Sequence, residues 1–347
     1  MDSFLAHYDD PLFSIILIVF IILAIALVTY GWSIYMQQRQ KSHLMEFLEK
    51  FEGAQCVLDE TDMPYDDSVS KPLLLLAKAF ETSGEYHKTI SIYLYLLKHA
   101  KNPELLEQLG KIYLRAGFLE RAESIFLEIL EKQPRDKPVL YQLGVVYEML
   151  QEYEKAIETL EPLEMLGEDT AVLRAFWEFE KLQKNSSLSP TEKETALLDM
   201  SKRHPSLYRY TIAALFELSH ERAWRHLEPD RLRESLDLLW YLPKSQLDFD
   251  IIQSDSRLAK IYFAKGILDE ITAEQMSISS GIIGIDILAA AKSAGETRGD
   301  ISFSYLCAQC KHSFPISFKR CPSCLAINSV KLEEQITKHE ERDYSIF

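Results

Sequence analysis

Glycine is scarce in this sequence, with 12 residues among 347, and such a composition favours helices over sheets. The sequence also lacks a glycine-rich loop of the kind that cradles phosphate, and it lacks a G-x-S-x-G nucleophile motif. Its histidines His204, His220 and His226 stand at unrelated spacings, which favours solvent-facing or capping roles over ligation. We therefore expect no catalytic residues and a protein that is not an enzyme.

Positive charge is in short supply as well. The chain carries 38 basic and 53 acidic side chains, which gives a formal net charge of -15. A chain this acidic repels a phosphate backbone, so nucleic acid is excluded as a partner of the chain as a whole. The hydrophobic fraction of 47% is ample for folded cores.

One long stretch lacks charge altogether. Leu12 to Tyr30 is uncharged, and the apolar character continues through Trp32, Ile34 and Met36. A helix needs about 20 such residues to cross a bilayer. A buried core helix and a cleavable signal peptide are the alternatives. The first ten residues contain no Lys or Arg and no small-x-small cleavage site follows, so we expect a retained transmembrane anchor at 11–36.

Basic residues near this span occur only on its C-terminal side, at Arg39 and Lys41. The positive-inside rule then places residues 1–10 outside the cytoplasm and the bulk of the chain within it. A reducing cytoplasm also suits free thiols, since paired cysteines there bind metal more often than they form disulfides.

The middle of the chain contains a repeat. From Gly110 to Gly144 is 34 residues, and so is Ala122 to Ala156. This period and these residue types match the tetratricopeptide pattern, in which each unit is a helical hairpin. Small residues at these positions let helices approach closely, while Tyr113, Phe126 and Tyr147 fill the space between them, and Pro134 ends a helix. An accidental spacing in an ordinary bundle is the alternative.

A weaker copy precedes these two, with Leu73, Ala77 and Tyr93 standing 33 residues before their counterparts. Beyond Gly167 the pattern decays, and we expect degenerate helical hairpins, one of them capped at Thr191 with Glu194 as its partner. The concave face of such a solenoid binds peptides or proteins. The expected divisions are a short extracytoplasmic terminus at 1–10, the anchor at 11–36, a juxtamembrane linker or helix at 37–70, tetratricopeptide repeats at 71–167, degenerate repeats at 168–299, a metal-binding module at 300–332 and a tail at 333–347.

Cysteine is rare, and four of the five cysteines fall within 18 residues. They form two C-x-x-C pairs, Cys307 with Cys310 and Cys321 with Cys324. Two such turns can grip one tetrahedral metal with four thiolates, most simply a structural zinc with no open position for water or substrate. Iron is the alternative metal, and unliganded or disulfide-linked cysteines are the alternative state. The remaining Cys56 is expected to be a small buried side chain.

Neighbours of these cysteines have expected roles too. Lys311, Lys319 and Arg320 are placed in sequence to offset the net charge of four thiolates on one zinc ion. The aromatic residues Tyr305, Phe314 and Phe318 can cover the metal and form a minimal core. Because so small a core cannot fold by itself, we expect metal binding to supply folding free energy.

The order of anchor, repeats and C-x-x-C pairs resembles the lipopolysaccharide assembly protein B family, also called LapB or YciM. In residues the likeness is closest at Tyr305-x-Cys307-x-x-Cys310, at Cys321-Pro-Ser-Cys324 and at Gly110 to Ala122. The family has Gly-Phe where this chain has Lys311-His312, and Trp where it has Lys319 and Ile327, which indicates a distant member.

The resemblance implies an all-α tetratricopeptide solenoid with one transmembrane helix and a small rubredoxin-like or zinc-ribbon module packed against the repeats. It also implies a membrane-anchored adaptor in the bacterial inner membrane that regulates lipopolysaccharide assembly. Members of the family promote degradation of the deacetylase LpxC by the membrane protease FtsH. Protein partners, and no cofactor beyond the metal, follow from this resemblance.

Two other functions remain open from the sequence. One is a general tetratricopeptide scaffold for another inner-membrane or envelope complex. The other is an electron-transfer protein with iron at the four cysteines, which would absorb visible light, whereas a zinc protein would not.

Overall fold

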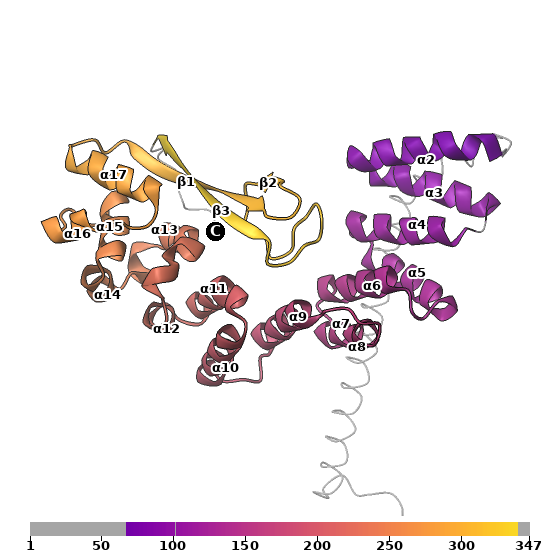
Figure 1. The fold of residues 1–347 in the computed structure, drawn as a ribbon, viewed down its shortest axis with the longest axis horizontal. Coiled ribbons are helices and arrows are strands. Elements are labelled where there is room, and N and C mark those ends of the chain that lie inside the picture. The colour runs from indigo at the N-terminus through magenta and orange to yellow at the C-terminus, as the bar shows by residue number, and fades with distance from the viewer. Residues whose placement is uncertain (1–66, 101, 339–347) are drawn as a thin grey trace, which may run out of the picture. The chain divides into compact units, whose positions relative to one another are not determined.

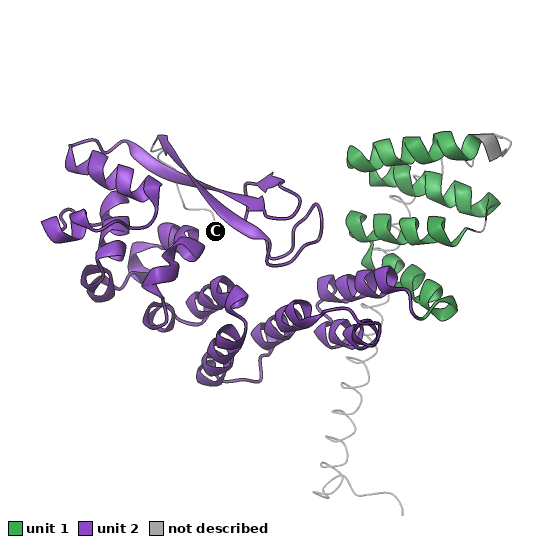
Figure 2. Cartoon of the chain, viewed as in Figure 1, with its two compact units in different colours: residues 1–134 green, residues 135–347 purple. Residues whose placement is uncertain are grey.

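The structure is a computed structural model that describes residues 67–100 and 102–338. The predicted anchor at 11–36, Cys56 and the last nine residues lie outside this range. Among the described residues, no helix is long and apolar enough to cross a membrane. The chain divides into two units at Pro134, coloured separately in Figure 2.

The described part of unit 1 consists of two helical hairpins (Figure 1). The first pairs α2 (Asp67–Thr82) with α3 (Tyr86–His99), and the second pairs α4 (Pro103–Ala116) with α5 (Leu119–Lys132). Asn102 caps α4 by accepting a hydrogen bond from the backbone N–H of Glu104 at 2.9 Å, and Gly117 ends it in the left-handed conformation. The helix α5 ends two residues before Pro134, as the sequence predicts.

Close packing explains the glycine in the second hairpin. A Cβ added at Gly110 would lie 2.6 Å from the ring of Phe126, which is completely buried. The same contact recurs in unit 2, where a Cβ at Gly144 would lie 2.5 Å from the ring of Trp177. The prediction that these glycines allow close helix approach is therefore confirmed, because any larger side chain would overlap an aromatic ring.

Unit 2 continues with helices and ends in a small sheet (Figure 1). Its longer helices are α6 (Lys137–Met149), α9 (Ala171–Lys184), α10 (Pro190–Arg203), α11 (Tyr208–Leu218), α15 (Ser256–Ala264) and α17 (Ile283–Ser293). Its shorter helical elements are α7 (Tyr153–Glu158), α8 (Leu160–Met165), η1 (Pro205–Leu207), α12 (His220–Arg225), η2 (Pro229–Ser235), α13 (Leu236–Tyr241), η3 (Lys244–Gln246), α14 (Phe249–Ser254) and α16 (Ala273–Ser277).

One predicted helix start is wrong by two residues. The cap of α10 is Ser189, which forms a capping box with Glu192, and not Thr191 with Glu194. Pro190 explains the difference, since proline is favoured at the first helical position and so places the cap one residue before itself. Glu194 is instead buried beside Arg222 and His226.

The C-terminal module is an antiparallel sheet with the strand order β2-β1-β3. The chain is therefore mostly helical and not all-α, which corrects the expectation from the sequence. Its strands are β1 (Gly299–Cys307), β2 (Ser313–Phe314) and β3 (Val330–Lys338). In β1, alternate residues from Ile301 to Cys307 are buried, which is the two-residue period of a strand with one covered face. The strand β3 pairs with β1 along its full length and runs to Lys338, six residues past the module boundary expected from the sequence.

The sheet shares its core with the helices before it. One apolar cluster joins Trp224, Trp240 and Tyr262 of the helices to Ile301 and Phe303 of β1. The ring of Tyr241 contacts that of Phe303 edge to face, with centroids 5.6 Å apart. The module is thus built onto α12–α17 and does not rely on a separate core of its own.

Candidate metal centre

The four cysteines of the module meet at one point. Cys307 is the last residue of β1, and the other three lie in the two turns that follow. Their sulfur atoms all lie within 4.8 Å of one another, with Cys307 Sγ 3.7 Å from Cys324 Sγ and Cys310 Sγ 3.6 Å from Cys321 Sγ. None is in a disulfide. Bonds of about 2.3 Å to a tetrahedral zinc place sulfur atoms about 3.8 Å apart, so this arrangement fits a metal ion.

The two C-x-x-C turns have the same backbone geometry. The N–H of Lys311 donates to Cys307 O at 3.0 Å, and that of Leu325 donates to Cys321 O at 2.9 Å. Both Lys311 and Leu325 adopt positive φ angles, 64° and 62°. The left-handed conformation, which favours glycine, is thus held by a lysine in one turn and by a leucine in the other.

Local hydrogen bonds make the four thiols unequal. Burial disfavours the thiolate of Cys307, but hydrogen bonds with Ser329 and with backbone N–H groups outweigh it and lower the pKa of Cys307 to about 6. Burial raises the pKa of Cys324 to about 12. Four thiolates this close repel one another, so their joint ionisation requires a cation between them. Sequence reasoning missed Ser329, which has no motif of its own.

The basic residues near the cysteines have partners on the helices. Lys319 Nζ lies 2.7 Å from Glu180 Oε1 and 3.1 Å from Gln183 Oε1, both on α9. Arg320 Nε lies 2.9 Å from Glu148 Oε1, and its Nη1 donates to Tyr141 Oη at 3.1 Å, both on α6. These two residues, expected to offset thiolate charge, thus fasten the cysteine loops to α6 and α9. Lys319 and Arg320 stand next to Cys321 in the sequence, but this position did not show that their side chains point to the helices.

The ion pair of Arg320 with Glu148 is buried, with side chains 8% and 11% exposed. The indole N–H of Trp177 donates to the same carboxylate. Burial of an ion pair is tolerated when further hydrogen bonds satisfy both ions, as they do here.

A second buried network connects the module to α11 and α13. Arg209 Nη1 and Nη2 each lie 2.6 Å from an oxygen of Asp237, and Tyr305 Oη donates to Asp237 Oδ2 at 2.8 Å. Arg209 Nη2 also donates to Ser317 Oγ at 3.2 Å. Tyr305 therefore fastens β1 to the helices in addition to its apolar role.

The remaining predicted residues are now placed. Phe314 and Phe318 pack edge to face with centroids 5.2 Å apart, in the same apolar cluster as Cys307 and Cys321. His204 and His220 lie at the ends of α10 and α12, and His226 Nε2 lies 2.9 Å from Glu194 Oε1.

These features define a class: a tetratricopeptide-type helical repeat protein with a four-cysteine cluster suited to a metal ion. The tetratricopeptide repeat family matches residues 125–158, which cover Phe126, Gly144 and Ala156.

Within this class, the chain is similar to lipopolysaccharide assembly protein B of Escherichia coli K12, with 34% identity over 101 residues. The match covers 28% of this chain and 26% of the relative, so it spans about a quarter of the length of the curated relative. The same protein of Escherichia coli O157:H7 matches equally. The resemblance inferred from the sequence is confirmed as a distant one.

Among solved structures, a tetratricopeptide repeat protein from Parabacteroides merdae has a TM-score of 0.37 and 18% identity, covering 72% of this chain and 96% of its own. The MamA RS-1 ArsTM double mutant has the same TM-score and 16% identity, covering 50% and 96%. At such scores neither likeness bears on function.

Proposed function

We propose that this protein is a membrane-anchored adaptor that regulates lipopolysaccharide biosynthesis or assembly. The observation that carries the proposal is the 34% identity to lipopolysaccharide assembly protein B over 101 residues. It is supported by the repeat match, since stacked helical hairpins present surfaces that bind other proteins. The role is one of binding, with no chemistry of its own.

The finer form of the proposal concerns its partners. The adaptor presents the deacetylase LpxC to the membrane protease FtsH and so promotes its degradation. The apolar span at 11–36 anchors it in the bacterial inner membrane, with residues 1–10 in the periplasm and the repeats in the cytoplasm. Confinement to the membrane raises the effective concentration of adaptor and protease for each other without any new contact.

The metal in this proposal is structural. Cys307, Cys310, Cys321 and Cys324 hold one zinc ion, with iron as the alternative that the same ligands admit. When bound, the ion supplies no catalysis because four thiolates leave no open coordination position. By joining the four cysteines, the ion fixes the loop that carries Lys319 and Arg320. These two side chains then hold the module on α6 and α9.

The experiment that tests the function is depletion of the protein in its own organism, with LpxC and lipopolysaccharide followed over time. We expect LpxC to become long-lived and lipopolysaccharide to rise. Unchanged LpxC turnover would reject the LpxC mechanism and favour a scaffold for another envelope complex. Re-expression from a plasmid is the control and should restore turnover.

A further inference from the structure

Ser329 lies between the two C-x-x-C turns and contacts both. It is only 8% exposed, and its Oγ lies 3.4 Å from the sulfur of Cys307. The same hydroxyl donates to Ala326 O at 3.2 Å, and that carbonyl also accepts from the N–H of Cys321 at 2.8 Å. The carbonyl of Ser329 accepts from the N–H of Ala308, in the first turn, at 2.6 Å. One buried residue outside the ligand set therefore joins the two turns that carry the ligands.

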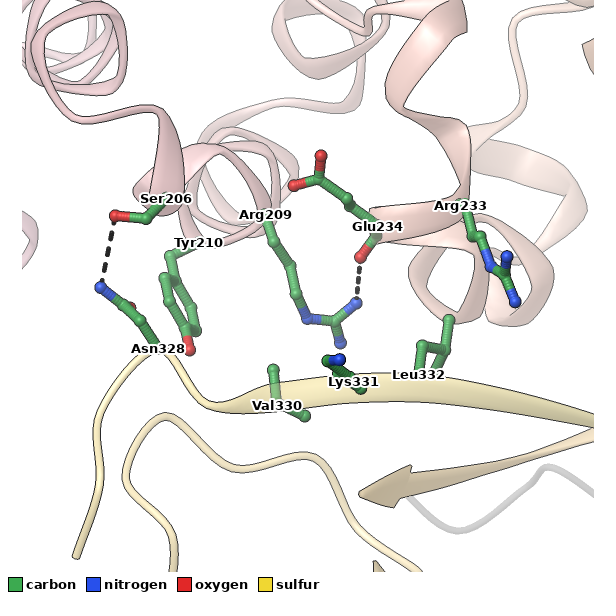
Figure 3. Close-up of a pocket in the computed structure, with 9 residues that line it drawn as sticks. All are labelled: Ser206, Arg209, Tyr210, Arg233, Glu234, Asn328, Val330, Lys331 and Leu332. Atoms are coloured by element: carbon green, nitrogen blue, oxygen red, sulfur yellow. Dashed lines mark hydrogen bonds between the residues drawn. The ribbon is translucent and has the colours of Figure 1, made fainter. Parts of the chain in front are cut away.

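The backbone on either side of Ser329 is held in place. Asn328, directly before it, adopts a φ angle of 49°, a conformation that asparagine takes more readily than most residues. Its Nδ2 donates to Ser206 Oγ in η1 at 3.4 Å (Figure 3). Val330, directly after Ser329, pairs with Cys307 in the β1–β3 ladder. Asn328 and Val330 both line the pocket of Figure 3, whereas the hydroxyl of Ser329 contacts the cysteine turns.

A thiol and a thiolate use the contact with Ser329 differently. A thiol is a weak donor, so the S–H of Cys307 donates to Ser329 Oγ when no ion is bound. A thiolate has no proton, so the hydroxyl of Ser329 donates to the sulfur when Cys307 is a metal ligand. That hydrogen bond is charge-assisted, and such bonds are roughly twice as strong as neutral ones. Ala326 O, which gives up the hydroxyl in this exchange, keeps the N–H of Cys321 as its donor.

We propose that Ser329 is a positioning residue of the metal centre, whose hydroxyl orients the sulfur of Cys307 and stabilises it as a metal-bound thiolate. Ser329 acts through Cys307 and is not itself a ligand. Hydrogen-bond partners of metal ligands fix the orientation of those ligands, and their loss typically lowers metal affinity by about 10–100-fold. This inference rests on the metal site of the proposed function and is independent of the partners of the adaptor.

Zinc affinity gives the first test. It is measured on the full chain in detergent micelles, by competition with a chromophoric chelator. Ser329→Ala should weaken zinc binding about tenfold, because the thiolate of Cys307 loses its hydroxyl donor. Ser313→Ala, the same change at an exposed position of β2, is the matched control and should leave zinc affinity unchanged. Equal affinities of the parent and Ser329→Ala, or an equal loss in the control, would overturn the proposal.

Cobalt distinguishes an effect on the sulfur from an effect on packing. Co²⁺ is bound by the same kind of ligands as Zn²⁺, and its sulfur-to-metal charge-transfer band reports the electron density of the thiolates. A hydrogen bond from a hydroxyl withdraws electron density from sulfur. Loss of that bond in Ser329→Ala should therefore shift the band of the fully loaded protein to longer wavelength. A band that stays at the parent position would show that Ser329 acts by packing alone, and would overturn the proposal.

Rescue by a second hydroxyl residue completes the test. Ser329→Thr keeps the donor and adds one methyl group at a buried position. The cobalt band of this variant should return to the parent position, and its zinc affinity should exceed that of Ser329→Ala. A Ser329→Thr protein with the band and affinity of Ser329→Ala would contradict a role for the hydroxyl.

These measurements separate the role of Ser329 from the proposals beside it. A parent chain that binds neither zinc nor cobalt would overturn this inference together with the metal centre. Weaker zinc binding and a shifted cobalt band in Ser329→Ala, while depletion leaves LpxC turnover unchanged, would support the role of Ser329 and reject the LpxC mechanism alone. Unaltered metal binding in Ser329→Ala, while depletion makes LpxC long-lived, would reject the role of Ser329 alone.

Discussion

The two halves of the C-terminal module are held on the helices by different forces. The β1–β3 ladder is held mainly by apolar burial, with Ile301 and Phe303 in the same cluster as Trp240 and Tyr262, and the hydrogen bond from Tyr305 to Asp237 adds to it. The cysteine loops are held by charged side chains that reach α6 and α9, with Arg320 on Glu148 and Lys319 on Glu180.

This difference shows where a metal matters. Apolar burial of the ladder needs no fixed loop geometry, since it depends on area removed from water. A buried ion pair needs both partners in place, because an ion left alone in the interior is costly. Arg320 directly precedes Cys321, so the metal ligand fixes the backbone that delivers it. We expect metal loss to release the loops first and leave the ladder attached.

The largest effect is expected from removing two ligands. Cys321→Ser together with Cys324→Ser should lower the metal content from about one zinc per chain, as one four-thiolate site requires, to less than a tenth of that. Apparent zinc-binding free energies of about 10–16 kcal/mol in finger peptides make this the dominant contribution to loop order. Trypsin should then cleave faster after Lys319 and Arg320, while hydrogen exchange in β1 and β3 stays slow.

The matched control is Cys56→Ser, a cysteine far from the cluster in sequence, which should leave metal content and cleavage unchanged. Metal is quantified by mass spectrometry, and the purified protein should be colourless, as zinc requires. Visible absorption would assign iron instead. Loops that remain protected after metal is lost would contradict the dependence of the ion pairs on the metal.

Short spacings made part of this arrangement predictable. The 34-residue period and the C-x-x-C pairs are local patterns, and the structure places Gly110 against Phe126 and gathers the four cysteines as those patterns indicate. The fastenings of the module were not predictable, since Arg320 and Glu148 stand 172 residues apart and Tyr305 and Asp237 stand 68 apart. No periodicity encodes such pairs, and only the packing of the module on the helices reveals them.

A smaller effect is expected from breaking one buried ion pair. Arg320→Met leaves Glu148 in the interior with Trp177 as a remaining donor, so the free energy of unfolding should fall by about 3 kcal/mol, the lower end for such pairs.

Truncating a core side chain of the ladder, by Phe303→Ala, should lower the free energy of unfolding by about 3–5 kcal/mol. The two are distinguished by metal retention in chelator, which Arg320→Met should weaken and Phe303→Ala should not.

The Arg320 effect has its own control in a double variant. Adding Glu148→Leu to Arg320→Met removes the stranded carboxylate and should restore much of the lost stability, as apolar replacement of a buried pair does. Denaturant unfolding measures both. A double variant no more stable than Arg320→Met would indicate that the arginine acts through its other contacts, with Tyr141 and with the carbonyl of Leu325.

The smallest effect concerns a buried charge on the helices that face the apolar half of the module. Lys265, at the end of α15, has its pKa lowered to about 8, mainly by burial, against the opposing attraction of Asp300 in β1. Because its pKa in the folded state lies below the unfolded value of about 10.4, the unfolded chain binds more protons between these two values. The free energy of unfolding should therefore rise with pH across this window.

Lys265→Met removes the buried ammonium together with its hydrogen bond to Leu242 O at 3.2 Å. At pH 7 the variant should exceed the parent in stability by about 1 kcal/mol or less, since the lost hydrogen bond offsets part of the gain. The advantage should shrink as pH rises from 8 to 10, where the parent lysine becomes neutral and keeps its hydrogen bond. A difference between the two proteins that stays constant over this range would show that Lys265 remains charged in the folded state. In that case the helices beneath the apolar half of the module would tolerate a buried charge as α6 and α9 do beneath the loops.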